Sequence, residues 1–179
     1  DGTVTRAEFL KMAMDSFGIV GHAYRDGECL DATNDDWYCY YLQGALDKDI
    51  IPEEMIENCN VTKVTKTLAE ATDDKKAVTT DVNVYTGKFD GDKPITREEM
   101  AAIAVRCKNY KMRRLTDWDN ERRYPIFSFK DSDEIDEKYI SDVVKAYNLN
   151  YIDGMEDGRF APKENLTRAQ AAVVMNNLK

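Results

Sequence analysis

One short motif occurs three times in this chain and limits its fold more than any other feature. Each copy reads apolar residue, Thr, Arg, any residue, then Glu or Gln, and each precedes a run of helically spaced apolar residues. The motifs cover 4–8, 95–99 and 166–170, and the runs cover 9–17, 100–108 and 171–178. Repeated units of this kind pack side by side, because one helix pair cannot bury its own apolar face. We therefore expect a mainly α-helical chain built from packed repeats.

The Thr and the Glu or Gln of each motif are typical of a helix N-terminus. A Thr followed three residues later by Glu or Gln forms a capping box, in which each side chain accepts a hydrogen bond from the other residue's backbone N–H. The pairs are Thr5/Glu8, Thr96/Glu99 and Thr167/Gln170. They predict three helix starts, and they need no functional explanation.

Apolar spacing predicts which side of each helix faces the core. The first and second helices each have one apolar face, in which apolar residues recur three or four positions apart. These faces are Ala7, Leu10, Met14 and Phe17 in the first helix and Met100, Ile103, Ala104 and Cys107 in the second. The third run is apolar over most of its circumference through Val174, which predicts a deeply buried helix.

The arginine of each motif is not explained by capping. It occupies the first helical position, where the helix dipole disfavours a cation by about 0.3–1 kcal/mol. Arg6, Arg97 and Arg168 could be structural ion-pair partners. A guanidinium beside free helix N–H groups is also a good site for a carboxylate or phosphate. Both readings stay open, and we favour anion binding.

The segments upstream of the second and third motifs also match each other. Both run in the order Asp, aromatic residue, amphipathic helix, short apolar strand or turn, and loop. They contain Asp31 and Trp37 before the second motif and Asp131 and Tyr139 before the third. Trp37 and Tyr139 begin amphipathic helices, so each is either a core anchor or a sugar platform. We favour the core anchor, because an aromatic residue at a helix start more often packs.

Two insertions account for the unequal spacing of the motifs. The first, near 57–92, has alternating Thr and Val residues that predict a β-hairpin. The second, at 112–126, is expected to be an exposed linker with a basic patch. Its notable residues are Arg113, Arg114, Arg122, Arg123 and Trp118, of which Trp118 either packs or offers a platform to a ligand.

Composition excludes several classes of protein. A net charge of −9 argues against nucleic-acid binding, which needs a basic face. No apolar run approaches the roughly 18 residues of a membrane helix. The four cysteines form no C-x-x-C pair and His22 is the single histidine, which argues against a structural zinc site. The cysteines could be buried hydrophobes or two disulfides, and we favour disulfides.

These residues resemble the S-layer homology family, whose repeats run from Phe-x-Asp through Asp-Gly-x-Phe-x-Pro to an Ile-Thr-Arg-Ala-Glu helix. The segment 129–178 is similar over its full length, with Tyr139 in place of Trp and Gln170 in place of Glu. The segment 30–108 keeps Asp31, Trp37, Ile50–Ile51 and the Thr-Arg helix. Of a first repeat, only 1–17 is present.

The resemblance implies a fold and an organisation. It implies a mainly α fold in which helical repeats pack as a pseudo-threefold bundle with a small β-hairpin insertion. It divides the chain into the C-terminal helix of a first repeat at 1–20, a second repeat at 21–111 with its insertion near 57–92, a linker at 112–126 and a third repeat at 127–179.

The resemblance also implies a function. Grooves between repeats in this family bind secondary cell-wall polysaccharides, often ones that carry a pyruvate ketal. This implies an extracellular module in the cell wall or S-layer, with other S-layer subunits as further partners and with no cofactor or metal. The implied ligand-binding residues are Arg6, Arg97, Arg168, Asp31, Asp131, Trp37, Tyr139 and Gly154.

Two other classes of function remain as alternatives. A calcium-dependent or protein-docking surface module is the main alternative, because 1–9 resembles the end of an EF-hand loop, although no full twelve-residue loop fits. An enzyme is the least favoured class, since the chain has one histidine and no activated serine motif. A glycosidase needs only two carboxylates, and sequence spacing does not give their separation.

Overall fold

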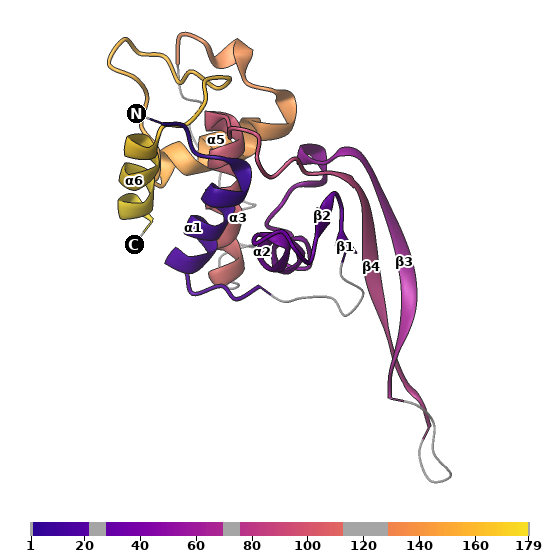
Figure 1. The fold of residues 1–179 in the computed structure, drawn as a ribbon. Coiled ribbons are helices and arrows are strands. Elements are labelled where there is room, and N and C mark those ends of the chain that lie inside the picture. The colour runs from indigo at the N-terminus through magenta and orange to yellow at the C-terminus, as the bar shows by residue number, and fades with distance from the viewer. Residues whose placement is uncertain (1, 22–27, 70–75, 113–128, 179) are drawn as a thin grey trace.

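The protein is a helical bundle from which one long β-hairpin projects (Figure 1). The computed structural model describes residues 2–21, 28–69, 76–112 and 129–178. The α-helices in these residues are α1 (Arg6–Ser16), α2 (Cys39–Leu46), α3 (Arg97–Lys111), α5 (Glu137–Asn148) and α6 (Arg168–Asn177), with 3-10 turns η1 (Glu53–Met55) and η2 (Ser132–Glu134). The expectation of a mainly α-helical chain is confirmed.

A closed cycle of backbone hydrogen bonds joins the three motifs. Val4 N–H donates to Leu166 C=O at 2.9 Å, Leu166 N–H to Ile95 C=O at 2.9 Å, and Ile95 N–H to Val4 C=O at 3.0 Å. Each apolar motif residue therefore donates to one neighbour and accepts from the other. Segments that lie far apart in the sequence meet at one centre.

A second cycle of bonds lies two residues further along each motif and runs round the motifs in the opposite sense. The backbone N–H of each motif arginine donates to the residue two positions before the next apolar motif residue. The bonds run from Arg6 to Lys93 at 2.9 Å, from Arg97 to Glu164 at 3.0 Å, and from Arg168 to Gly2 at 3.1 Å. The backbone around the three helix starts therefore follows one repeated pattern.

The three predicted capping boxes are confirmed. In α1, Thr5 Oγ1 accepts from Glu8 N–H at 3.2 Å, and Glu8 Oε2 accepts from Thr5 N–H at 2.9 Å. Thr96 and Glu99 cap α3 in the same way, and Thr167 and Gln170 cap α6. The helices start where local sequence places them, at the arginine of each motif.

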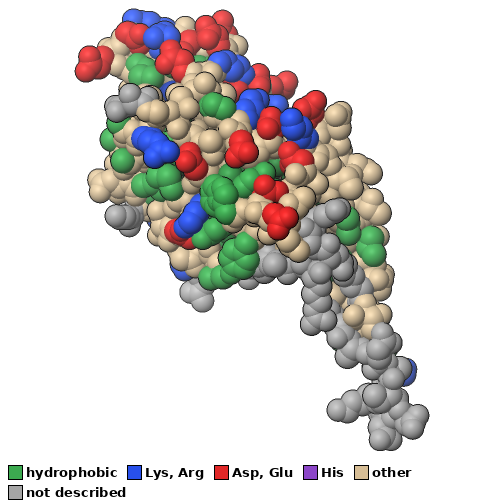
Figure 2. All heavy atoms as spheres, in the orientation of Figure 1, with side chains coloured by type: hydrophobic (Ala, Val, Ile, Leu, Met, Phe, Trp, Pro, Cys, Tyr) green, Lys and Arg blue, Asp and Glu red, His purple; other side chains and the backbone are tan. Residues whose placement is uncertain are grey.

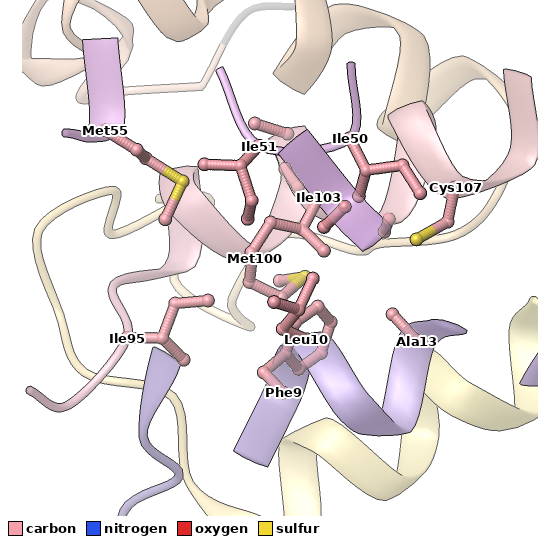
Figure 3. Packing of buried hydrophobic residues seen from close by; sticks show 14 of the residues in the cluster. Phe9, Leu10, Ala13, Ile50, Ile51, Met55, Ile95, Met100, Ile103 and Cys107 are labelled. Carbon is pink, nitrogen blue, oxygen red and sulfur yellow. The ribbon is translucent and has the colours of Figure 1, made fainter. Parts of the chain in front are cut away.

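The core lies between α1, α3 and the loop after α2. Phe9 and Leu10 of α1 pack near Met100 and Ile103 of α3, and Ile50 follows α2 (Figure 3). Each of these side chains is fully buried, and burial of one such side chain stabilises the fold by about 1.5–3 kcal/mol. The predicted core faces of the first two helices are confirmed.

The predicted deep burial of the third helix is wrong. Ala171, Val174 and Met175 of α6 are buried, but Val173 is 57% exposed. In the described chain, α2 packs on α1 and α5 packs on α3, whereas the main contact of α6 is with α1. In the described chain no helix packs on the outer side of α6, so part of the apolar surface of α6 faces outward.

The predicted β-hairpin is confirmed within the first insertion. Strands β3 (Glu57–Ala69) and β4 (Val78–Lys88) pair antiparallel, with Val64 opposite Val82. The hairpin leaves the bundle at Gly87, whose φ of 137° favours glycine. A Cβ there would lie 2.8 Å from Glu57 O. A shorter ladder joins β1 (Glu28–Cys29) to β2 (Ala32–Thr33).

The cysteines correct another expectation. All four are free thiols, so the predicted disulfides are wrong. Cys29, Cys39 and Cys107 are buried and behave as small hydrophobic residues, and burial raises the pKa of Cys29 to about 12. The predicted linker at 112–126 lies outside the described residues except for Met112, so its arginines and Trp118 remain untested.

Candidate functional site

The structure separates the three motif arginines by their surroundings, beginning with Arg6. Its side chain is 8% exposed and forms an ion pair with Glu99 of α3, with Nε 3.3 Å from Glu99 Oε2. Arg6 Nη1 also donates to Phe89 C=O at 2.6 Å. All of these contacts are internal, as in the structural ion-pair reading. Ligand binding at Arg6 remains a prediction.

Arg97 is equally buried, but its partners are carbonyl groups. Its Nε donates to Phe160 C=O at 2.7 Å, and its Nη2 donates to Asp153 C=O at 2.9 Å. The guanidinium carbon lies 5.1 Å from the centre of the Phe160 ring. Burial lowers the pKa of Arg97, because the charged form loses hydration. Among the described residues, its charge is met by carbonyl dipoles and a ring face, with no direct carboxylate contact.

Gly154 lies beside Arg97 in the structure. Both line a cavity of about 170 Å³ that also includes Gln170 of α6. A Cβ at Gly154 would lie 2.6 Å from Cε1 of Phe129, so a larger side chain would displace that ring. Glycine is therefore needed at this position for packing. Because it has no side chain, it also does not narrow the cavity.

The two predicted aspartates bind the backbone of the loops whose carbonyls accept hydrogen bonds from Arg6 and Arg97. Asp131 accepts from Phe160 N–H and Ala161 N–H, both at 2.8 Å, while Arg97 binds the carbonyl of the same Phe160. Asp31 likewise accepts from Phe89 N–H at 2.7 Å and Asp90 N–H at 2.9 Å. These carboxylates shape the loops through backbone contacts.

Arg168 differs from the other two arginines because its side chain is 69% exposed. Its side-chain contact in the described chain is with Glu8 Oε1 at 3.2 Å. Arg6 and Arg97 instead reach the carbonyls of Phe89 and Phe160, which each lie six residues before an apolar motif residue. Among the described residues, no phenylalanine carbonyl accepts a hydrogen bond from Arg168.

An open pocket of about 290 Å³ surrounds Arg168 and brings two predicted site residues together. Its lining residues are Val4, Glu8, Lys11, Met12, Trp37 and Arg168. Trp37 is 52% exposed, so the favoured core-anchor reading is wrong for this residue. The neighbouring Tyr38 is buried instead, against Gly91. A ring face and a guanidinium are thus both available to a ligand in one pocket.

Sequence reasoning missed Lys11 in this pocket. Lys11 pairs with Asp15 one helical turn later, and its Nζ lies 5.0 Å from the centre of the Tyr41 ring. The hydrogen bond with Asp15 raises the pKa of Lys11, which keeps the amine charged. Its signal was its spacing of three residues from Glu8, which puts both on one face of α1.

Tyr139 lies apart from both pockets. It is buried in α5, and burial raises the pKa of its hydroxyl. The core-anchor reading fits Tyr139, and its role toward a ligand remains a prediction. The arginine pockets therefore combine Arg97 with Gly154 and Arg168 with Trp37.

Acidic and basic side chains are mixed on the face of the molecule drawn in Figure 2. Figure 2 shows exposed hydrophobic side chains among acidic and basic ones on the face that carries α1. Among the described residues, no cluster of three or more His, Cys, Asp or Glu side chains is placed to hold a metal ion. None of the described helices combines the length and apolar character needed to cross a membrane.

Comparison with known proteins identifies a family on part of the chain. The family model of the S-layer homology domain matches residues 128–172. The chain is 32% identical over 176 residues to an amylopullulanase of Thermoanaerobacterium thermosulfurigenes, which aligns 98% of this chain with 8% of that protein. It is also 32% identical over 176 residues to an exoglucanase of Acetivibrio thermocellus, with 98% and 13% coverage.

A third relative is an endoglucanase of Bacillus sp. (strain KSM-635), with 38% identity over 102 residues, covering 55% of this chain and 10% of that protein. The chain spans only 8–13% of the length of these relatives. The resemblance to the S-layer homology family is confirmed at residues 128–172.

Proposed function

We propose, starting from the S-layer homology domain at residues 128–172, that this chain is a non-catalytic cell-surface anchor. It binds an anionic wall polysaccharide, and the open pocket at Arg168 is the principal site. The relatives carry the names of glycan-degrading enzymes, yet the chain corresponds to 8–13% of their length. So small a share supports an accessory module rather than a catalytic domain.

The repeats form a pseudo-threefold bundle in this proposal. The closed cycle through Val4, Ile95 and Leu166 supports it, because each motif makes the same two backbone contacts. The helix packing of the described chain also repeats, with α2 on α1 and α5 on α3. A groove then lies beside each motif arginine, between one repeat and the next.

The three grooves differ at one equivalent position, the last residue of each motif. Glu99 occupies it beside Arg6 and neutralises the guanidinium inside the fold. Gln170 occupies it beside Arg97, and a neutral amide leaves that arginine without a carboxylate partner there. Glu8 occupies it beside Arg168, where the contact is exposed to solvent. A carboxylate ligand can compete with an exposed ion pair, since such pairs are worth about 0–1 kcal/mol.

The chemistry of the Arg168 pocket fits a sugar that carries a carboxylate. A guanidinium binds a carboxylate through two parallel hydrogen bonds, and Lys11 adds a second cation. The exposed ring of Trp37 offers a flat apolar face to a sugar ring. A pyruvate ketal supplies one carboxylate on a sugar, so pyruvylated polysaccharide is the ligand we propose. The single observation that carries the proposal is the joint exposure of Arg168 and Trp37 in one pocket.

Sedimentation with isolated cell walls tests the function. The wild type should sediment with walls, and added salt should weaken binding because exposed charges are screened. Arg168→Ala should sediment less, whereas Arg159→Ala should behave as the wild type. Arg159 is a matched control, because it is another partly exposed arginine with carboxylate partners, and it lies outside the pocket.

Equal sedimentation of all three proteins would contradict the role of Arg168. Calcium-dependent binding, or binding to wall protein but not to purified polysaccharide, would favour the alternative of a docking module.

A further inference from the structure

A separate cavity lies between the end of α2, α3 and α5. Its volume is about 430 Å³, larger than the pockets at Arg97 and Arg168. Four cationic side chains line it, together with two carboxylates. The cations are Lys48, Arg106, Lys138 and Lys145, and the carboxylates are Asp49 and Asp142. In a chain of net charge −9, this local excess of positive charge stands out from the average surface.

One ion pair within the cavity is structural. Arg106 Nε lies 3.3 Å from Asp142 Oδ2, and the Asp142 side chain is 11% exposed. Burial raises the pKa of Asp142 while Arg106 opposes that rise, so this carboxylate is committed to its arginine. Asp142 therefore neutralises Arg106, and Asp49 is the other carboxylate in the lining of the cavity.

The lysines differ in how firmly they are already engaged. Lys138 Nζ donates to Glu54 C=O at 3.3 Å and lies 3.9 Å from Asp136. Lys48 Nζ lies 5.7 Å from the centre of the Tyr110 ring. In the described chain, neither Lys48 nor Lys145 has an ion pair within 4.0 Å. Two amines from different elements are thus available to one ligand in this cavity.

We propose that this cavity binds a phosphate group carried on a hydroxylated ligand. Lysine amines suit phosphate as compact point charges, and they gain most when two of them face a doubly charged group. Asn109 and Ser141 also line the cavity and offer an amide and a hydroxyl to ligand hydroxyl groups. The cavity has room for more than the phosphate alone.

This site is independent of the proposed polysaccharide site, since none of its lining residues lines the Arg168 pocket. The phosphate could come from a small phosphate monoester or from a phosphodiester polymer. Glycerol 1-phosphate and poly(glycerol phosphate) distinguish these sources, because they share the chemistry and differ in length and charge per phosphate.

The test is titration calorimetry of the intact protein with both probes. The wild type should bind at least one of them. The double variant Lys48→Gln/Lys145→Gln should bind about tenfold more weakly, since two charge-assisted contacts are lost. Lys93→Gln is the matched control, an exposed lysine outside the cavity. Arg168→Ala should bind both probes as the wild type does.

Thermal melting and circular dichroism should show that the double variant is folded, because it removes no buried contact. Tighter binding of the monoester would point to a small ligand, and tighter binding of the polymer to a chain; either supports the site. Absence of binding of both probes to the wild type would overturn the proposal. Equal loss in Lys93→Gln would also overturn it, because binding would then follow overall charge rather than this cavity.

Discussion

Arg6 at the start of α1 and Glu99 in the first turn of α3 form a buried ion pair that links two of the Thr-Arg motifs across 93 residues of sequence. Glu99 also accepts from Thr96 N–H at 3.1 Å, so one carboxylate both caps α3 and neutralises Arg6. A residue chosen for a local helix start therefore carries a long-range contact as well.

Glu99→Gln should destabilise the protein by about 3–5 kcal/mol, because it leaves the buried guanidinium of Arg6 without its counter-charge. Glutamine preserves the capping box, as Gln170 does in α6, so the loss would report the ion pair. Urea denaturation measures it. Glu8→Gln is the control, since its pair with Arg168 is exposed and should change stability by less than about 1 kcal/mol. Equal losses in the two variants would refute this account of the pair.

Asp131→Ala should cost about 1–3 kcal/mol for each buried N–H left without an acceptor, at Phe160 and Ala161. Asp31→Ala should cost less, because Asp31 and the N–H of Asp90 are exposed. Thermal or urea unfolding of the two variants makes the comparison. A larger loss for Asp31→Ala would show that burial does not set the importance of these carboxylates.

Trp37→Ala and Tyr139→Ala should separate binding from stability. Tyr139 is buried, and its loss should cost about 3–5 kcal/mol of unfolding free energy. Trp37 is half-exposed, and its loss should change stability by about 0.5 kcal/mol or less while weakening attachment to walls. A severe loss of stability in Trp37→Ala would place this ring in the core and remove it from the proposed site.

The cysteines should react as four thiols when the protein is denatured without reductant, because all four are free. Alkylation followed by intact-mass measurement counts them. In the folded protein Cys107 should react most slowly, since it is fully buried. A count of zero or two alkylated thiols after non-reducing denaturation would contradict the free-thiol arrangement.

Features governed by neighbouring residues could be predicted from the sequence. Thr5 and Glu8 lie three residues apart, so their capping box depends on one turn of backbone. The hairpin also follows from alternation within each strand, which is a local property.

Features governed by distant partners could not be predicted. The three arginines have the same local sequence, yet Arg6 meets Glu99, Arg97 meets Phe160 C=O, and Arg168 is exposed. Their difference depends on which loop reaches each helix start. The exposure of Val173 has a related cause, since an apolar residue is buried only if another element covers it.

The burial of adjacent aromatic residues could not be predicted from the sequence either. Trp37 and Tyr38 are adjacent in the turn before α2, yet Tyr38 is buried and Trp37 is half-exposed. Lys11 was missed because its spacing from Glu8 places both on one face of α1 but does not show that a pocket forms beside them.

The most direct test of the central claim is equilibrium binding of a pyruvylated wall polysaccharide before and after chemical removal of pyruvate, with the wild type and Arg168→Ala. Removal should weaken wild-type binding by about tenfold or more, because a charged bidentate contact is lost. It should cause little further loss in Arg168→Ala, because that variant already lacks the partner of the carboxylate. Equal affinity of the wild type for both polysaccharides, or an undiminished pyruvate effect in Arg168→Ala, would contradict the central claim.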